Sequence, residues 1–170
     1  YLDFTAATAS LGATLTGGEG DDTIDAVNNS GSGVYLGALG DDSIFGGTGS
    51  EKMYGGAGAD TLNSGASGGA DTIYGDAGAD LITNSNTGAA GTRTQIFGGA
   101  DSDTIGSTAN AAGGGHSITG GAGSDSISLT SSAGVVDANT DVLLYDSFAE
   151  FVSGGAMVDT ITLNAAADSA

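Results

Sequence analysis

Residues 55–63, GGAGADTLN, combine three glycines, an Asp and one aliphatic residue in an order that recurs along the chain. Near-copies are GGEGDDTID (17–25), GALGDDSIF (37–45), GGTGSEKMY (46–54), GDAGADLIT (75–83), GGADSDTIG (98–106) and GGAGSDSIS (120–128). They fit a nine-residue repeat, G-G-x-G-x-D-x-U-x, in which U is a large aliphatic residue. Tandem copies are rarely produced by a composition that is merely rich in Gly, so we take the repeat as the signal that decides the fold.

The nine residues divide into six turn residues and three strand residues. In the strand triplet, the middle side chain points to one face and its two neighbours point to the other. Gly at the first, second and fourth positions permits positive φ without a Cβ penalty. Two turns and two strands make a coil of about eighteen residues, and stacked coils form two parallel sheets around a thin aliphatic core. The predicted fold is all-β, a right-handed parallel β-roll (a β-helix or solenoid) of about seven to eight coils.

The aliphatic positions fall into two series that predict two different edges. One series is entered by turns of constant length that end in Asp; it contains Ile24, Ile44, Leu62, Ile82, Ile105 and Ile127. The other series contains Met53, Ile73, Ile96 and Ile118. Its turns lengthen, and Thr94 and His116 stand where the Asp belongs. We therefore expect one regular edge and one looped edge, with insertions on the looped edge alone.

Charge and composition limit the function classes. The 170 residues include 33 Gly and no Pro, Cys or Trp, and 21 acidic residues face only Lys52 and Arg93, which leaves a net charge of −19. Such a net charge is common in disordered chains, but aliphatic residues at fixed spacing argue against disorder. A folded chain with this charge needs bound cations to offset it. The negative sign disfavours nucleic acid and anionic membranes. Because no apolar run approaches the roughly 20 residues of a span, we expect no membrane insertion.

The repeats resemble those of the RTX family, which are calcium-binding nonapeptides of parallel β-helix proteins. The resemblance implies several Ca²⁺ ions between successive turns, held by carbonyls of the glycine region and by the Asp at the sixth position. On the regular edge the implied carboxylate ligands are Asp22, Asp42, Asp60, Asp80, Asp103 and Asp125, with Asp141 and Asp159 as further candidates. On the looped edge they are Glu51 and Asp71. The implied glycine ligands are Gly17, Gly18, Gly20, Gly37, Gly40, Gly55, Gly56, Gly58, Gly75, Gly78, Gly98, Gly99, Gly120, Gly121 and Gly123.

The alternative for these carboxylates is that they are solvated turn formers. A bare column of them at strand spacing would repel itself, which favours the metal. The aliphatic core is too thin to offset the loss of chain entropy, so we expect calcium binding to be coupled to folding. The repeats predict one domain over residues 1–170, with an irregular coil at 1–16, clear repeats at 17–128 and degenerate repeats at 129–170. Asp101 and Met157 replace the third Gly and weaken their turns.

Enzyme motifs are poorly supported. GASGG at residues 65–69 has the pattern of a nucleophile elbow, but it lies in a Gly-rich loop with no helix to follow. His116, the single histidine, follows three glycines, and we predict a solvent-facing turn residue rather than a base or zinc ligand. We therefore expect a protein that is not an enzyme. The aromatic residues are predicted to form outward ladders between coils; they are Tyr35, Phe45, Tyr54, Tyr74 and Phe97.

Three functions fit a calcium roll. The first, which we favour, is an extracellular structural protein, secreted or at the cell surface, that self-assembles as a surface-layer, filament or adhesin subunit with other copies of itself or neighbouring subunits. The resemblance points to a bacterial protein exported by type I secretion. The second is the C-terminal secretion and folding module of a larger exported hydrolase or toxin; the start at Tyr1 suggests a processed or excised piece. The third, ice or sugar binding, is disfavoured because the turns lack a regular array of Thr and Asn.

Overall fold

The computed structural model describes residues 2–3, 12–65, 69–85, 93–109, 116–131, 142–144 and 160–164. Strands and turns make up this described part of the chain, in which no helix is long and apolar enough to cross a membrane. Two of the predicted ligands, Asp141 and Asp159, lie outside the described residues, as does Met157.

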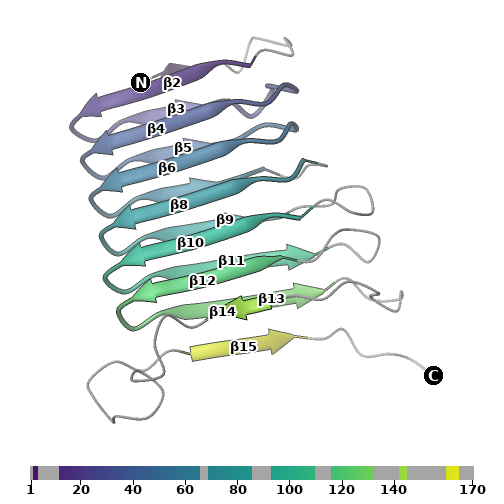
Figure 1. The fold of residues 1–170 in the computed structure, drawn as a ribbon. Coiled ribbons are helices and arrows are strands. Elements are labelled where there is room, and N and C mark those ends of the chain that lie inside the picture. Colours follow the sequence, from purple (N-terminus) through teal and green to yellow (C-terminus); the bar gives the residue numbers. More distant parts are fainter. Residues whose placement is uncertain are drawn as a thin grey trace.

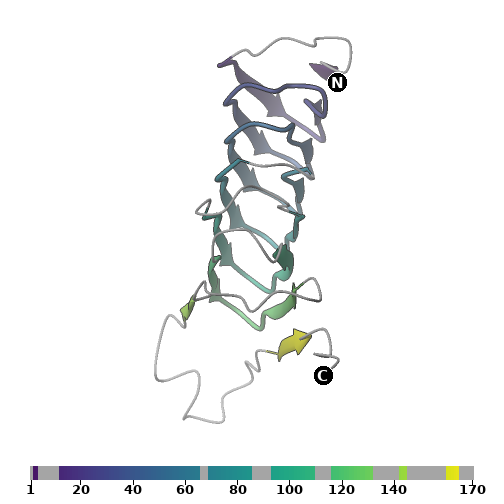
Figure 2. The same cartoon turned by 90° about the vertical axis from the view of Figure 1, so that its right-hand side faces the viewer.

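The strands form two parallel sheets that lie face to face, as Figures 1 and 2 show. The eight-stranded sheet contains β1 (Leu2–Asp3), β3 (Thr23–Asp25), β5 (Ser43–Phe45), β7 (Thr61–Asn63), β9 (Leu81–Asn84), β11 (Thr104–Ala109), β13 (Ser126–Ser131) and β15 (Thr160–Asn164). The seven-stranded sheet contains β2 (Thr14–Glu19), β4 (Val34–Leu39), β6 (Lys52–Ala57), β8 (Thr72–Ala77), β10 (Gln95–Ala100), β12 (Ser117–Ala122) and β14 (Val142–Leu144). Consecutive strands alternate between the sheets over most of the chain, so the fold is the predicted parallel β-solenoid.

The register of the seven-stranded sheet sets the coil length. Thr14, Val34, Lys52, Thr72, Gln95 and Ser117 are successive partners, so they mark about 5 complete turns of the solenoid. The predicted count of about seven to eight coils differs slightly from this number. The short strands β1, β14 and β15 extend the sheets beyond these complete turns.

The core is two facing rows of side chains, one from each sheet. The eight-stranded sheet contributes Ile24, Ile44, Leu62, Ile82, Ile105 and Ile127, and the seven-stranded sheet contributes Leu15, Tyr35, Met53, Ile73, Ile96 and Ile118. Both predicted series are therefore confirmed as core. Tyr35 corrects the prediction of an outward ladder, because it lies in the Met53 row and is fully buried. Its ring fits because Gly33 has no Cβ, and its hydroxyl accepts a hydrogen bond from Asn29 Nδ2 at 2.9 Å.

Strands of the seven-stranded sheet are longer than the predicted triplets. β4, β6, β8, β10 and β12 each have six residues, because pairing continues into the first three residues of the following turn. The backbone N–H of Gly40 donates to the carbonyl of Ala57, and that of Gly58 donates to Ala77, just beyond the strand ends. Small turn residues thus let neighbouring coils approach closely enough for the ladder to continue.

The connections define two edges, which Figure 1 separates clearly. On the short-turn edge, each strand of the seven-stranded sheet passes to the other sheet through a tight turn such as residues 40–42 or 58–60. On the looped edge the chain returns through longer connections, such as residues 26–33 and 46–51. The predicted asymmetry between a regular and a looped edge is therefore confirmed.

Candidate metal centres

The short-turn edge carries a column of aspartates that link one coil to the next. In each case, the backbone N–H of one Asp donates to Oδ1 of the Asp in the following coil. The bonds run from Asp22 to Asp42 (2.7 Å), Asp42 to Asp60 (2.7 Å), Asp60 to Asp80 (2.8 Å), Asp80 to Asp103 (2.9 Å) and Asp103 to Asp125 (2.9 Å). Of the column, Asp42, Asp60, Asp80, Asp103 and Asp125 are buried. Because these carboxylates are buried, they are not the solvated turn formers of the alternative interpretation.

The second carboxyl oxygen of these aspartates is not satisfied by the protein. Within the described residues, Oδ2 of Asp42, Asp60, Asp80 and Asp103 is buried and has no hydrogen-bond partner. A buried acceptor of this kind costs about 1–3 kcal/mol, and more when it is charged. The repetition of this cost in four successive coils is the strongest sign that the edge receives a ligand that the chain itself does not supply.

Glycine carbonyls lie beside the same oxygens. A Cβ placed on Gly55 would collide with Oδ2 of Asp60 and with the carbonyl oxygen of Gly75 in the next coil. Gly37, Gly75 and Gly98 have the same surroundings in their own coils. Carboxylate and carbonyl oxygens therefore gather at each of these first glycines, which must be glycine because there is no room for a side chain.

The turn glycines have two distinct roles. On the short-turn edge, the glycines at the second and fourth positions take positive φ, as in Gly78 (127°) and Gly121 (108°). Those at the first position are absent from the positive-φ set, which corrects our expectation that they need that conformation. Asp101 keeps the turn despite replacing the third Gly, with φ of 75°. Ala38 and Asp76 also take positive φ, at 90° and 73°, in place of the second Gly.

This donor set suits a hard divalent cation. Calcium binds six to eight oxygens from carboxylates and backbone carbonyls, in flexible geometry. A cluster of three or more His, Cys, Asp or Glu side chains that could hold a metal is not present among the described residues. Any ion on this edge would therefore be held by the Asp of one coil, the Asp of the next and the glycine carbonyls between them. The residues fit calcium better than a transition metal, which prefers nitrogen and sulfur ligands.

In the absence of a cation, burial disfavours the ionised form of the aspartates and raises their pKa. The pKa of Asp103 is raised to about 7, mainly by the loss of hydration on burial and additionally by the neighbouring charges of Asp80, Asp125 and Asp101. The same cause raises the pKa of Asp80 to about 6, with smaller contributions from Asp60, Asp76 and Asp101. In both cases the backbone N–H of the preceding coil opposes the shift. A cation bound between the coils would reverse this effect, because it favours the ionised form.

The looped edge has one carboxylate pair. Glu51 and Asp71 are buried, and the backbone N–H of Glu51 donates to Oδ1 of Asp71 at 3.0 Å, as in the aspartate column. Oε1 of Glu51 accepts the N–H of Gly49 at 3.0 Å, whereas Oε2 is buried with no partner in the described part of the chain. Burial is the main cause that raises the pKa of both groups. The neighbouring Asp71 carboxylate raises the pKa of Glu51 further, whereas hydrogen bonds with Glu51 and Ser64 partly oppose the shift of Asp71. This pair could hold one further cation.

Neutral side chains continue this edge beyond Asp71. The N–H of Asp71 reaches the hydroxyl of Thr94 at 3.4 Å, so Thr94 occupies the place of the carboxylate. Opposite it, Asn84 Oδ1 accepts from Ser64 Oγ at 2.7 Å, and Asn84 Nδ2 donates to Ser107 Oγ at 3.1 Å. His116 Nδ1 lies 3.3 Å from Asn84 Nδ2. We call Ser64, Asn84, Thr94, Ser107 and His116 the neutral column; all five side chains are buried.

The neutral column corrects one prediction and supplies residues that the sequence reasoning missed. His116 is 2% exposed, so it is an interior residue and not a solvent-facing one. Ser64, Asn84 and Ser107 each lie two residues after a core aliphatic, namely Leu62, Ile82 and Ile105. A period of two places them on the inward face, and this was the signal that could have identified them. Most of GASGG, including Ser67, lies outside the described residues.

Comparison with known families agrees with the repeat. The family model of the RTX calcium-binding nonapeptide repeat (4 copies) matches residues 13–26, 27–62 and 66–85. The structural repeat continues past the matched segment, because Asp103 and Asp125 keep the hydrogen bond that defines the column. No curated protein matches the chain. No solved structure matches it either.

Proposed function

Because residues 13–85 carry RTX calcium-binding nonapeptide repeats, we propose that this chain is a calcium-dependent structural protein of the cell exterior. In this proposal it self-assembles, as a surface-layer, filament or adhesin subunit, through the ends of the solenoid or through the looped edge. Sheet order supports assembly: among the described residues, β2 and β14 are the outermost strands of the seven-stranded sheet, and an outermost strand edge can act as a template for another chain. A head-to-tail contact that does not close generates a filament.

The observation that carries the calcium part of the proposal is the set of buried Oδ2 atoms of Asp42, Asp60, Asp80 and Asp103. We propose that the aspartate column, Asp22 to Asp125, and the first glycines of its turns hold a row of Ca²⁺ ions. Glu51 and Asp71, on the looped edge, would hold one further Ca²⁺ ion. When bound, the ions supply positive charge that cancels the repulsion between stacked carboxylates, so the folded state is favoured only in their presence.

The same chemistry supports the proposed exterior location. Extracellular calcium modules bind at about 10⁻⁴–10⁻³ M, far above the calcium level inside cells. A chain of this kind would stay unfolded at the low calcium level inside the cell and would fold after export. The described residues present a repetitive scaffold with a filled core, which supports a structural role over a catalytic one.

Calcium depletion tests the proposal. We expect the far-ultraviolet circular dichroism of the calcium-loaded protein to be β-like and to collapse in excess chelator, with recovery on adding calcium but not magnesium. A β-like spectrum that persists in chelator would refute coupled folding. Electron microscopy of the same samples should show filaments or lattices with calcium only. Isolated rods in saturating calcium would instead support the alternative, a folding module of a larger exported hydrolase or toxin.

A further inference from the structure

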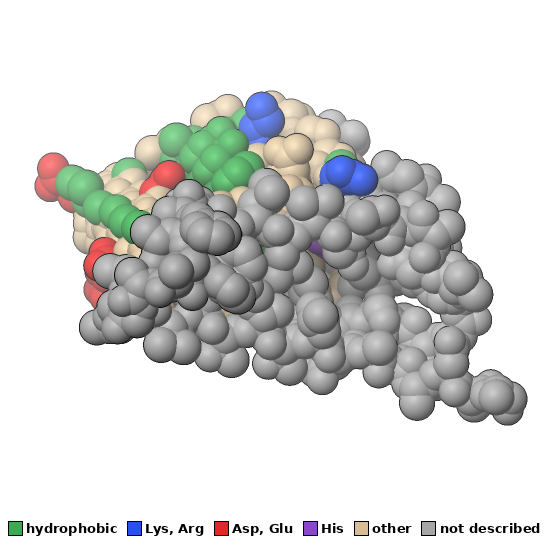
Figure 3. Space-filling model, turned by 60° about the horizontal axis from the view of Figure 1, so that its bottom comes forward, with side chains coloured by type: hydrophobic (Ala, Val, Ile, Leu, Met, Phe, Trp, Pro, Cys, Tyr) green, Lys and Arg blue, Asp and Glu red, His purple; other side chains and the backbone are tan. Residues whose placement is uncertain are grey.

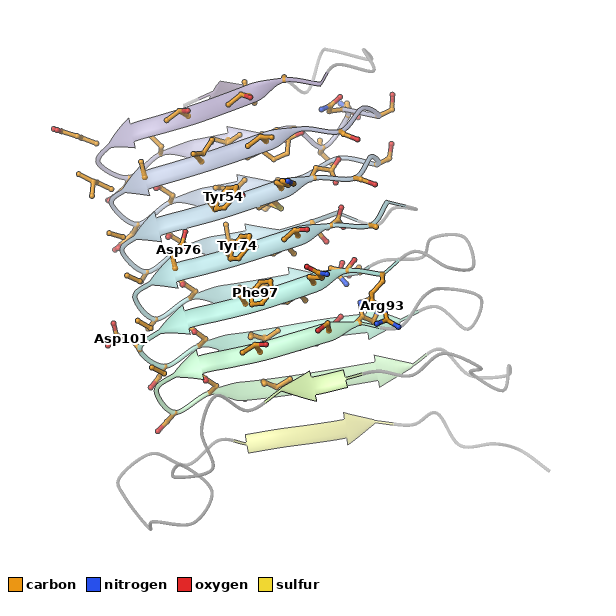
Figure 4. The ribbon with its side chains drawn as sticks, viewed as in Figure 1. Tyr54, Tyr74, Asp76, Arg93, Phe97 and Asp101 are labelled. Carbon is orange, nitrogen blue, oxygen red and sulfur yellow. The ribbon has the colours of Figure 1, made fainter. Side chains whose placement is uncertain are left out.

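The outer face of the seven-stranded sheet carries a continuous ridge. Leu36, Tyr54, Tyr74, Phe97 and Thr119 are register partners on successive strands and project outward from the core. The rings of Tyr54 and Tyr74 are stacked with centroids 5.0 Å apart and planes within 6°, and those of Tyr74 and Phe97 with centroids 4.8 Å apart and planes within 7°. Figure 4 shows the three rings one above another on the front of the sheet. We call these five residues the ridge.

Stacking determines what the ridge offers to a partner. Because each ring lies against the next coil's ring, the ring faces are largely occupied within the molecule and the ring edges point outward. A sugar or a cation that recognises aromatic residues needs an open ring face. The ridge instead presents partly exposed ring edges, together with the hydroxyls of Tyr54 and Tyr74, at strand spacing. Such a surface can pack against another flat face of mixed polarity. Tyrosine is enriched at protein interfaces, because its ring packs against a partner while its hydroxyl forms hydrogen bonds.

Charges flank the ridge in a symmetrical way. Lys52 lies two residues before Tyr54 and Asp76 two residues after Tyr74, while Arg93 lies four residues before Phe97 and Asp101 four residues after it. All four side chains are exposed. Lys52 and Arg93, the only Lys and Arg in the chain, therefore lie on the looped-edge side, and the two carboxylates lie on the short-turn side. Figure 3 shows the apolar side chains between the basic and acidic ones.

We propose that this face pairs with the same face of a second copy, about a two-fold axis parallel to the ridge. Such an axis lays ridge on ridge and exchanges the looped-edge side for the short-turn side. Arg93 then faces Asp101 of the other copy, and Lys52 comes within one coil, about 4.8 Å along the axis, of Asp76. The contact is self-complementary, as a two-fold interface must be.

The opposite orientation is disfavoured by the same charges. An axis across the ridge would keep the looped-edge sides together, so that Lys52 of one copy would lie over Arg93 of the other. Like charges placed opposite each other suppress the wrong pairing. The charge pattern thus selects parallel solenoids, with equivalent coils at equivalent heights.

Engineered cysteines test the orientation, because the chain contains no native Cys. In the parallel arrangement, Thr119→Cys of one copy lies opposite Thr119→Cys of the other. We therefore expect Thr119→Cys to form a disulfide-linked dimer under mild oxidation in saturating calcium. Thr104→Cys, on the outer face of the eight-stranded sheet, is the matched control and should stay reduced. Equal cross-linking of both variants, or of neither, would overturn the proposal.

Sedimentation of the calcium-loaded protein tests the energetics. We expect a dimer that Arg93→Glu weakens by about tenfold or more, because Glu would face Asp101, whereas Arg93→Gln should weaken it less. A monomer at high concentration, a dimer insensitive to Arg93→Glu, or a monomer that binds oligosaccharide at the ridge would each refute the pairing.

The pairing rests on the proposed function only in requiring the calcium-loaded fold. Filaments in electron microscopy without cross-linking at Thr119→Cys would leave the proposed function standing and refute the pairing. Cross-linked dimers that never form filaments or lattices would support the pairing and refute self-assembly as the proposed function.

Discussion

The two edges of the solenoid stack the same strands with different chemistry. On the short-turn edge, the bonds that define the column run from the N–H of one Asp to Oδ1 of the Asp in the next coil, and they end on aspartates from Asp42 through Asp125. On the looped edge, the same bond ends on Asp71 in one coil and on the neutral Thr94 in the next. Backbone geometry is thus maintained by a carboxylate or by a hydroxyl, but only the carboxylate leaves a second buried oxygen that needs a cation.

The difference between the two edges indicates that calcium is required only where carboxylates are stacked. Among the described residues, the neutral column has no buried polar side-chain atom without a hydrogen-bond partner. Asn84 contacts Ser64, Ser107 and His116, and Thr94 accepts from the N–H of Asp71. A hydrogen-bonded network of this kind needs no ion, whereas stacked carboxylates do. We interpret the part of the looped edge that follows Asp71 in the sequence, where the neutral column lies, as held together without metal.

Asn84→Ala should have the largest effect, because it removes the centre of the neutral column. We expect a loss of about 2–4 kcal/mol in the free energy of unfolding at saturating calcium, since the hydroxyls of Ser64 and Ser107 would lose a buried partner. Urea unfolding followed by circular dichroism measures this loss. Gln95→Ala, at an exposed position, serves as the control and should change little. A loss no larger than that of the control would show that calcium alone holds both edges.

Asp80→Asn should separate charge from hydrogen bonding on the short-turn edge. The amide oxygen can still accept the N–H of Asp60, but a charged ligand is lost. We expect the calcium concentration at half-folding to rise about tenfold, while the metal-free protein gains stability because buried repulsion is relieved. Calcium titration monitored by circular dichroism, with and without chelator, gives both quantities. An unchanged calcium midpoint would place the ion elsewhere.

Acid should partly replace calcium on the short-turn edge. The pKa values of Asp80 and Asp103 are raised in the fold, to about 6 and about 7, from an ordinary value of 3.8. The folded state therefore binds more protons than the unfolded state, and metal-free stability increases as pH falls from about 7 towards 4. We expect strand content in chelator to rise over this window. With limiting calcium, acid should instead weaken calcium binding, because protons compete for the same oxygens.

Ala38→Gly should have the smallest effect, and it tests the cost of positive φ at the second position of the turn. Ala38 has φ of 90°, a conformation that a Cβ makes unfavourable. We expect a gain of about 0.5–1 kcal/mol in the free energy of unfolding, measured by urea at saturating calcium. Ala57→Gly, one residue beyond the corresponding position of the next coil and without positive φ, should be destabilising instead. Equal effects of the two substitutions would contradict this explanation.

Much of the fold was predictable because the repeat is local. The nonapeptide predicted parallel stacked coils, both core rows, and the asymmetry between Asp-ended turns and longer loops. Tyr35 was misplaced because the sequence has no nonapeptide around it, and its burial depends on the space that Gly33 leaves in the folded coil. His116 was misplaced because its glycine-rich loop resembles a surface turn, although the following strand turns the side chain inward.

The sequence by itself determined the period, and with it the alternation of strands and turns and the alignment of one Asp above another. Tertiary structure decided which side chains meet between coils. Those contacts join residues 18, 20, 22 or 23 positions apart, so they depend on the length of each intervening loop. Burial of Oδ2 of Asp60, the partners of Asn84, and the stacking of Tyr54, Tyr74 and Phe97 all arise at that level. The physical reason is that a repeat sets the direction of each side chain, whereas neighbours and exclusion of water exist only once the coils are stacked.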